Sequence, residues 1–212
     1  MPLYQDLKCN ESTRLLIWKI TESVEDVLEQ VELKPKSQLR LDGMKSVLHQ
    51  RAFLSVRMLL KEVGLNDFDL HYTKTGKPYL DHGKHISITH SHQFAAIIIS
   101  DSEIGIDIEM QREKIQRIAS KFIESENSYL NPEATKEYIK KLTVIWGVKE
   151  AIFKIKNEKG ISFKDHIEVD SFLLTKKETL AFLKFNGITE RFRIHFFEIE
   201  DCTLVYAFPC PN

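Results

Sequence analysis

The chain has 212 residues, 42% of them hydrophobic and 10% aromatic, which suffices for the core of one large domain or of two packed halves. Thirty basic residues stand against thirty-one acidic ones, so the formal net charge at pH 7 is -1. This balance excludes a global electrostatic attraction to nucleic acid or to an anionic membrane, and any basic binding site must be local.

The cysteines and the start of the chain indicate the compartment. Cys9, Cys202 and Cys210 are widely spaced and form no CxxC pair, which favours reduced thiols over a disulfide framework. The first twenty residues lack a basic stretch followed by a long apolar run, and no eighteen apolar residues occur in succession. We therefore expect a soluble, cytoplasmic protein with neither a membrane nor a nucleic acid as its partner.

The first third of the chain carries strand and helix signals. The apolar run Arg14–Ile20 has the length of a strand, and Thr21 is a possible N-cap for a short helix over Glu22–Glu32. Apolar residues at helical spacing then predict one long helix over Lys36–Val63, which Gly64 would end.

Extended segments dominate the stretch from His71 to Ile108, where HYT, HISITH, FAAIIIS and IGIDIE predict strands. The spacing over Glu113–Glu124 is helical. The Asn-Pro-Glu sequence at 131–133 then predicts the start of a second long helix, which runs to about Asn157.

The chain returns to strand patterns after Gly160, in HIEVDSFLL, TLAFLKF, RFRIHFFEIE and CTLVYAFP, with Asn186 and Gly187 as a hairpin turn. Each half of the chain thus holds a long helix and ends in a pair of strands. We therefore predict a pseudo-duplicated α+β protein, with an N-terminal half at 1–106 and a C-terminal half at 107–212.

Two carboxylates stand two residues apart in the segment IGIDIEM. On a strand, Asp107 and Glu109 would project from the same face, where their repulsion favours a hard divalent cation such as Mg²⁺ with its preference for oxygen ligands. The alternative is an exposed strand end with two solvated acids, which is the commoner meaning of a D-x-E triplet taken alone.

A second motif, WGVKEAIFK, lies in the second long helix. Trp146, Glu150 and Lys154 are four residues apart and share one helix face, with Lys149 next to it. A tryptophan packed in the core and an ordinary i,i+4 ion pair between Glu150 and Lys154 would explain the same spacing without any function.

A third group of residues suits phosphate binding. Lys77 lies in a Gly-Lys-Pro turn, and Thr89, His90 and Ser91 fall at the end of a strand, where their donors could hold a phosphorylated ligand. Equally, His90 and His92 could be half-buried strand residues whose rings are satisfied within the protein.

The order of these motifs, G-K-P, T-H-S, G-I-D-I-E and W-x-x-K-E-A-x-x-K, resembles the 4′-phosphopantetheinyl transferase superfamily from about Lys36 to Gly160. The length and the two-half layout are similar to the monomeric surfactin-type branch rather than to the short trimeric carrier-protein synthases. The resemblance implies the fold of this family, with a small antiparallel sheet packed on a long helix in each half and the active site in the cleft between the halves.

The resemblance also implies a metal site and a catalytic helix. In the family, the two acids of G-x-D-x-E and the glutamate of W-x-x-K-E bind Mg²⁺, which assigns Asp107, Glu109 and Glu150 to one ion. Glu150 is also a candidate base for the serine that is modified. Lys154 matches a lysine that neutralises the transferring phosphate, and Lys149 matches the first lysine of the pattern, whose expected role is phosphate contact.

Coenzyme A contacts follow from the resemblance as well. His90 and Lys77 match residues near the 3′-phosphate of coenzyme A, and Thr89 keeps a hydroxyl donor where the family has a serine. Arg51 is placed like an arginine that surfactin-type enzymes use on the same phosphate, with Arg57 as the alternative.

Besides Thr89, three further positions depart from the family pattern. Ser87 replaces an asparagine, and His92 stands where a glycine is common, so that it would crowd the adenine pocket or add a cation at low pH. Near Phe122, Asn127 replaces an acid, and Glu126 is a candidate to take its place.

The function implied is Mg²⁺-dependent transfer of the 4′-phosphopantetheine arm of coenzyme A to a serine of an apo acyl or peptidyl carrier protein, with release of 3′,5′-ADP. The carrier is expected to be a small acidic helical domain, and the enzyme a monomer. Two alternatives stay open. One is a coenzyme A or nucleotide-binding module without transferase activity, and the other is an unrelated Mg²⁺-dependent phosphohydrolase, which would explain the carboxylates but neither G-K-P nor the W-x-x-K-E helix.

Overall fold

The computed structural model describes residues 2–211 and consists of two compact units, which meet in the sequence between Ser102 and Glu103. Both units pack helices on antiparallel sheets, so the α+β class is confirmed. The units divide slightly before the predicted boundary at 106/107, because strand β7 (Gly105–Met110) pairs along its length with β11 (Cys202–Pro209) and belongs to the second unit. The pseudo-duplication stays a prediction.

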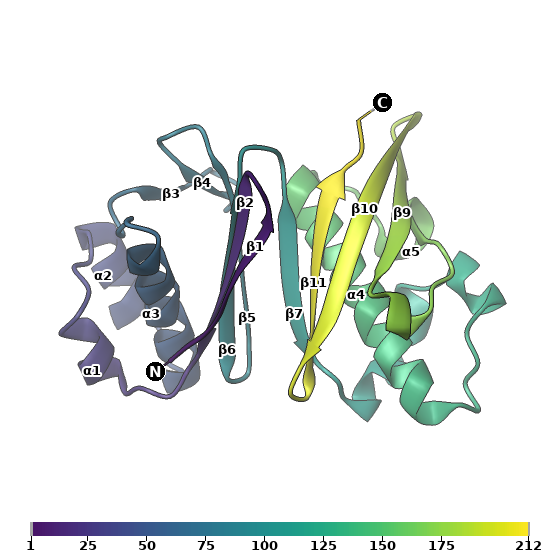
Figure 1. The fold of residues 1–212 in the computed structure, drawn as a ribbon, viewed down its shortest axis with the longest axis horizontal. Coiled ribbons are helices and arrows are strands. Elements are labelled where there is room, and N and C mark those ends of the chain that lie inside the picture. The colour runs from purple at the N-terminus through teal and green to yellow at the C-terminus, as the bar shows by residue number, and fades with distance from the viewer. Residues whose placement is uncertain (1, 212) are drawn as a thin grey trace. The chain divides into compact units, whose positions relative to one another are not determined.

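The first unit is built on a four-stranded antiparallel sheet in the order β1-β2-β6-β5, with β3 and β4 forming a separate two-stranded sheet. The strands are β1 (Leu3–Asn10), β2 (Thr13–Lys19), β3 (Leu70–Tyr72), β4 (Pro78–Leu80), β5 (His85–Ser91) and β6 (Phe94–Ser100). The helices are α1 (Val24–Leu28), α2 (Pro35–Asp42) and α3 (Val47–Glu62). Helix α3 lies against one face of the four-stranded sheet (Figure 1).

The prediction of one long helix over 36–63 is wrong, because this segment forms two helices, α2 and α3. Gly43 ends α2, and its backbone N–H donates to the carbonyl oxygen of Leu39. Ser46 then caps α3 by accepting a hydrogen bond from the backbone N–H of His49. Glycine is a poor helix residue and serine a preferred N-cap, so these local signals outweigh an apolar pattern that runs across the break.

Two smaller features of the first unit also differ from the sequence prediction. The helix expected over Glu22–Glu32 is the shorter α1, and Ser23 rather than Thr21 caps it, with Asp26 completing a capping box. Strand β1 has no counterpart in the prediction, because LYQDLKCN alternates between half-buried and exposed positions without a strong apolar signal.

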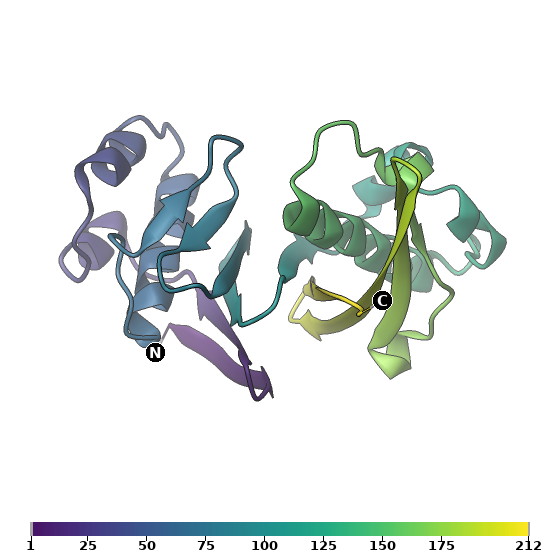
Figure 2. The ribbon, with the colours of Figure 1, turned by 90° about the horizontal axis from the view of Figure 1, so that it is seen from above.

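The second unit holds a five-stranded antiparallel sheet in the order β7-β11-β10-β9-β8. Its other strands are β8 (Ile167–Val169), β9 (Glu178–Phe185) and β10 (Ile188–Ile199). Its helices are α4 (Thr135–Lys156) and α5 (Phe163–His166), with 3₁₀ helices η1 (Glu113–Lys121), η2 (Ser125–Ser128) and η3 (Leu174–Lys176). Helix α4 packs against β7 and β11 of this sheet (Figure 2).

Helix α4 begins at Thr135, three residues later than the Pro132 start that the sequence predicts. The side chain of Asn131 caps a preceding turn instead, where it accepts a hydrogen bond from the backbone N–H of Glu133. The predicted end is confirmed, because Asn157 follows the last helical residue with a left-handed φ of 49°.

The remaining element predictions of the second unit are largely confirmed. Strands β8 to β11 follow Gly160, and Asn186 and Gly187, with φ of 51° and 75°, form the hairpin turn between β9 and β10. The α-helix expected over Glu113–Glu124 is the 3₁₀ helix η1. Within residues 2–211, no helix combines the length and the hydropathy that a membrane span requires.

Two glycines set the distance between α4 and the sheet. A Cβ added to Gly105 on β7 would lie 2.0 Å from the carbonyl oxygen of Ala151 on α4. A Cβ added to Gly147 on α4 would lie 2.7 Å from Val205 Cγ2 on β11 and 3.8 Å from Asp107 Oδ2. The backbone of the helix therefore lies against β7 next to Asp107, which no larger residue at either position would permit without a shift.

Candidate active site

Asp107 and Glu109 lie on β7, on the face of the sheet that α4 covers. Side chains alternate along a strand, so two residues separated by one project from the same face. Val205 of β11 lies opposite Asp107, and Thr203 lies opposite Glu109. Asp107 is buried, while Glu109 is half-buried. These are not two solvated acids at an exposed strand end.

The carboxylates of Asp107, Glu109 and Glu150 lie within electrostatic reach of one another. Burial is the main cause that raises the pKa of Glu109 to about 7, and the charges of Asp107 and Glu150 act in the same direction. Burial is also the main cause that raises the pKa of Glu150 on α4, and the charge of Asp107 adds to it. Burial and neighbouring carboxylates thus oppose the ionisation of Glu109 and Glu150, and a partly buried site of this kind favours a bound cation.

Lys154 of α4 is a cation next to these acids. Its Nζ donates to Asp107 Oδ1 and to the carbonyl oxygen of Ile106, each at 2.8 Å. The charge of Lys154 also acts to lower the pKa values of Glu109 and Glu150, against the larger effect of burial. Lys154 thus pairs across to β7, and not with Glu150 in the i,i+4 pair that helix spacing alone would predict.

Trp146 connects the acids to the rest of the second unit. Its side chain hydrogen-bonds to the carboxylate of Glu109, an interaction that favours the ionised form. Its ring meets Phe122 and Phe163 edge to face, with ring centroids 5.1 and 5.5 Å apart. Trp146 is therefore a half-buried residue that packs against the core and also contacts an acid of the candidate site.

The acids fit Mg²⁺ by their chemistry, although their side chains are not already gathered for it. Among residues 2–211, no three His, Cys, Asp or Glu side chains lie in an arrangement that could hold a metal as they stand. The donor set is nevertheless all carboxylate oxygen, which Mg²⁺ prefers, and the raised pKa values show a repulsion that a cation would relieve. Lys154 holds Oδ1 of Asp107, while Oδ2 of the same carboxylate accepts no hydrogen bond among the described residues.

The predicted coenzyme A contacts lie in the first unit. Arg51 donates from Nη2 to the carbonyl oxygen of Ile20 at 3.0 Å, while its buried Nε has no hydrogen-bond partner among the described residues. The ring of His90, at the end of β5, lies 6.2 Å from the ring of His49, which is near the start of α3. These contacts gather basic side chains from α3 and β5.

Lys77 and Thr89 have contrasting surroundings. Thr89 is buried within β5. Lys77 follows Gly76, whose φ of 88° forms the turn between β3 and β4, and the backbone N–H of Lys77 donates to Thr73 Oγ1.

His92 occupies a position at which the backbone itself favours glycine. It lies in the two-residue turn between β5 and β6 with a φ of 51°, in the left-handed region. This conformation explains why a glycine suits the position, and the His92 side chain is exposed there.

Comparison with known proteins relates the second unit to one family. Residues 103–207 match the model of the 4′-phosphopantetheinyl transferase superfamily. The match spans nearly the whole of the second unit. It is also 28% identical over 141 residues to the 4′-phosphopantetheinyl transferase gsp of Aneurinibacillus migulanus, in a match that covers 65% of this chain and 56% of that protein. Both findings agree with the predicted resemblance to the surfactin-type branch.

The superfamily match covers only part of the predicted site. It includes the three acids on β7 and α4 together with Lys154, and it excludes every predicted coenzyme A contact of the first unit, because those residues precede residue 103. The chain spans little more than half the length of the curated relative that it matches.

Two basic residues singled out from the sequence are buried in ion pairs and give no support to a phosphate contact. Lys149 is fully buried and pairs with Glu126 at 2.7 Å. Arg57, the alternative to Arg51, pairs with Asp67 at 2.8 Å, with both side chains at most 2% exposed. Sequence reasoning missed both partners, since an ion pair between distant segments leaves no local pattern.

Replacing Glu109 with glutamine should stabilise the metal-free protein at pH 8 by about 2 kcal/mol, after allowance for solvent screening. The folded-state pKa of about 7 lies above the ordinary value of 4.5, so the folded protein binds the extra proton between these values. Stability from this group therefore falls as the pH rises from about 5 to 7 and stays low above that range. Urea midpoints of both proteins at pH 5 and pH 8 test this.

Mg²⁺ provides the control for this prediction. Saturating Mg²⁺ should raise the urea midpoint of the wild type at pH 8 and have much less effect on the Glu109→Gln variant, since the ion relieves the same repulsion. A variant that is less stable than the wild type at pH 8 without metal would contradict the electrostatic account of the site.

Proposed function

We propose that this protein transfers the 4′-phosphopantetheine arm of coenzyme A to a serine of an acyl or peptidyl carrier protein, with Mg²⁺ held by Asp107, Glu109 and Glu150. The observation that carries the proposal is the set of three coupled carboxylates from β7 and α4, inside the region that matches the superfamily. A phosphohydrolase would share these acids, but the superfamily match favours the transferase.

The chemistry follows from the properties of these side chains. The serine hydroxyl attacks the β-phosphate of coenzyme A, a bond forms between Oγ and phosphorus, and the bond to the leaving 3′,5′-ADP breaks. Glu150, whose pKa burial raises, is suited to accept the serine proton. Mg²⁺, when bound, neutralises the pyrophosphate charge. Lys154, whose Nζ lies 2.8 Å from Asp107 Oδ1, is the cation next to these acids and is suited to neutralise the phosphate that is transferred.

The first unit supplies the contacts to the 3′-phosphate of coenzyme A in this proposal. Arg51 has a buried Nε with no hydrogen-bond partner among the described residues, and the rings of His90 and His49 are neighbours. Lys77 and Thr89 complete the proposed set of donors. Lys149 is left out of it, because its ammonium is fully buried in an ion pair.

The carrier protein is proposed to dock on η1. This helix begins four residues after Glu109 and exposes Lys114, Arg117 and Lys121, with Ile118 37% exposed among them. A basic surface with an apolar residue next to the active site suits a small acidic helical domain. The enzyme is proposed to act as a monomer.

Reversing two charges on η1, as Arg117→Glu with Lys121→Glu, should lower kcat/KM for the carrier protein about 10-fold at low salt, because rim charges mainly steer association. The KM for coenzyme A should not change. Steady-state kinetics at two salt concentrations measure this. Lys176→Glu, an exposed lysine of η3 in the same unit, is the matched control and should behave like the wild type. An equal effect of both changes would argue against docking on η1.

The direct test of the proposed function is the intact mass of an apo acyl carrier protein after incubation with this protein, coenzyme A and Mg²⁺. The expected gain is one phosphopantetheine, about 340 Da, which EDTA should abolish. Coenzyme A binding without a mass gain on several carriers would favour the binding module. Release of free phosphate would favour the phosphohydrolase.

A further inference from the structure

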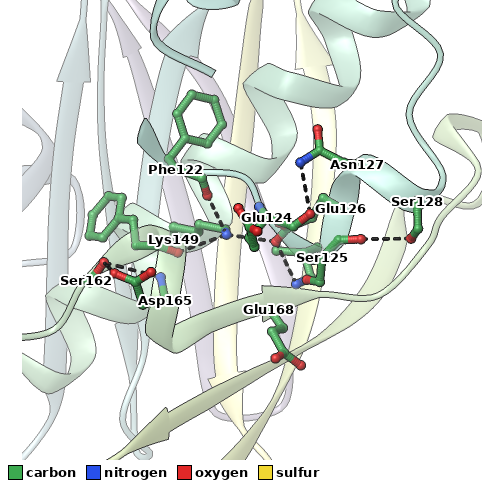
Figure 3. A network of polar contacts seen from close by, with 12 residues as sticks. Phe122, Glu124, Ser125, Glu126, Asn127, Ser128, Lys149, Ser162, Asp165 and Glu168 are labelled. Atoms are coloured by element: carbon green, nitrogen blue, oxygen red, sulfur yellow. Dashed lines mark hydrogen bonds and ion pairs between the residues drawn. The ribbon is translucent and has the colours of Figure 1, made fainter. Parts of the chain in front are cut away.

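The second unit contains a fully buried ion pair that joins helix α4, which carries Glu150, to the 3₁₀ helix η2. Lys149 Nζ lies 2.7 Å from Glu126 Oε1, and both side chains are at most 1% exposed. The ammonium also donates to the carbonyl oxygens of Phe122 at 2.6 Å and Phe163 at 2.9 Å, so its three hydrogens are all engaged (Figure 3).

Glu126 is satisfied in the same way. Its Oε1 accepts a hydrogen bond from the backbone N–H of Val169 at 3.1 Å, and its Oε2 accepts one from the backbone N–H of Glu124 at 3.0 Å. The pair thus joins α4 to η2, β8 and the start of α5. A buried polar network whose groups all have partners holds one arrangement, because any other leaves a buried charge without hydrogen bonds.

A chain of contacts runs from this pair to the metal acids. Phe122 and Phe163 accept the hydrogen bonds of Lys149 with their carbonyl oxygens. Both residues also pack their rings against Trp146. Trp146 in turn hydrogen-bonds to Glu109. Lys149 also directly precedes Glu150 on α4, so fixing Lys149 fixes the rotation of the helix that aims Glu150.

We propose that Lys149 and Glu126 are positioning residues for the Mg²⁺ site, acting on Glu109 through Phe122, Phe163 and Trp146 and on Glu150 through the rotation of α4. This inference rests on the proposed function, since it needs the acids to bind the ion. It assigns Lys149 no contact with phosphate. Outer partners of metal ligands commonly change metal affinity when they are lost.

The test measures Mg²⁺ binding without coenzyme A or carrier protein. In a Trp18→Phe background Trp146 is the only tryptophan, so its emission during a Mg²⁺ titration reports on the site. The variant is Glu126→Gln with Lys149→Met, which removes both charges together and leaves no unpaired buried ion. We expect its half-saturating Mg²⁺ concentration to rise about 10-fold.

Two further variants separate positioning from stability. Arg57→Met with Asp67→Asn removes the other buried ion pair, in the first unit, and should leave the half-saturating concentration unchanged even if stability falls. Phe163→Leu keeps the carbonyl oxygen that binds Lys149 and removes the ring against Trp146. It should raise the half-saturating concentration about 3-fold, and it keeps the inference testable if the double variant fails to fold.

The outcomes are distinct from those of the proposed function. A double variant within 2-fold of the parent would overturn the positioning role, and so would a Trp146 emission that does not respond to Mg²⁺ in the parent. Absence of phosphopantetheine transfer by the wild type would refute the proposed function but would leave the titration result unaffected, because no substrate takes part in it.

Discussion

Replacing Glu150 with glutamine should reduce the rate of phosphopantetheine transfer by about 100- to 1,000-fold, the loss typical of one charged group at a site of charge development. Glutamine keeps the size of the side chain but removes the carboxylate that is both the proposed metal ligand and the proposed base. The ionised carboxylate of Glu150 destabilises the metal-free protein, because burial and the charge of Asp107 raise its pKa. The variant should therefore be at least as stable as the wild type at pH 8.

Glu137→Gln is the matched control for Glu150→Gln. Glu137 lies on the same helix, is exposed and pairs with Lys141 at 2.9 Å. Its loss should change the transfer rate less than 2-fold, since exposed i,i+4 pairs contribute only about 0.3–0.5 kcal/mol. The transfer rates are measured by intact mass at saturating Mg²⁺. A rate for Glu150→Gln within 5-fold of the wild-type rate would remove Glu150 from the mechanism.

The sequence allowed each half of the candidate site to be proposed because the spacing within each half is local. Asp107 and Glu109 share a strand face, and Trp146, Glu150 and Lys154 share a helix face, so short-range geometry suffices for each group. What brings the two groups together is tertiary packing. The ion pair of Lys154 with Asp107 shows this, because helix spacing alone favours Glu150 as the partner.

The buried ion pairs were beyond the reach of the sequence. A lysine or an arginine in a helix is exposed far more often than buried, so the residue type alone predicts exposed side chains for Lys149 and Arg57, which are in fact buried. Their partners, Glu126 and Asp67, lie in other segments of the chain.

The helix break between α2 and α3 was missed for a different reason, since the apolar pattern continues through Gly43.

Replacing Gly105 with alanine should destabilise the protein by about 3–5 kcal/mol, which is at the upper end for a single substitution. The new Cβ would lie 2.0 Å from the carbonyl oxygen of Ala151 and 3.0 Å from Ile155 Cγ1. The first contact is with helix backbone, so a change of rotamer cannot relieve it, and α4 must move away from β7. That movement would also separate Glu150 from Asp107.

Gly43→Ala is the control for Gly105→Ala, because the added Cβ would meet its nearest atoms at 3.5 and 3.7 Å and the backbone there is right-handed helical. Its urea midpoint should be close to that of the wild type, with the free energy of unfolding changed by no more than about 0.5 kcal/mol, as for most unstrained substitutions. Gly105→Ala should lower the midpoint strongly and also weaken Mg²⁺ binding in the protein that remains folded. A Gly105→Ala variant with a wild-type midpoint would mean that α4 and β7 are farther apart than the structure has them, and the proposed metal site would lose its geometric basis.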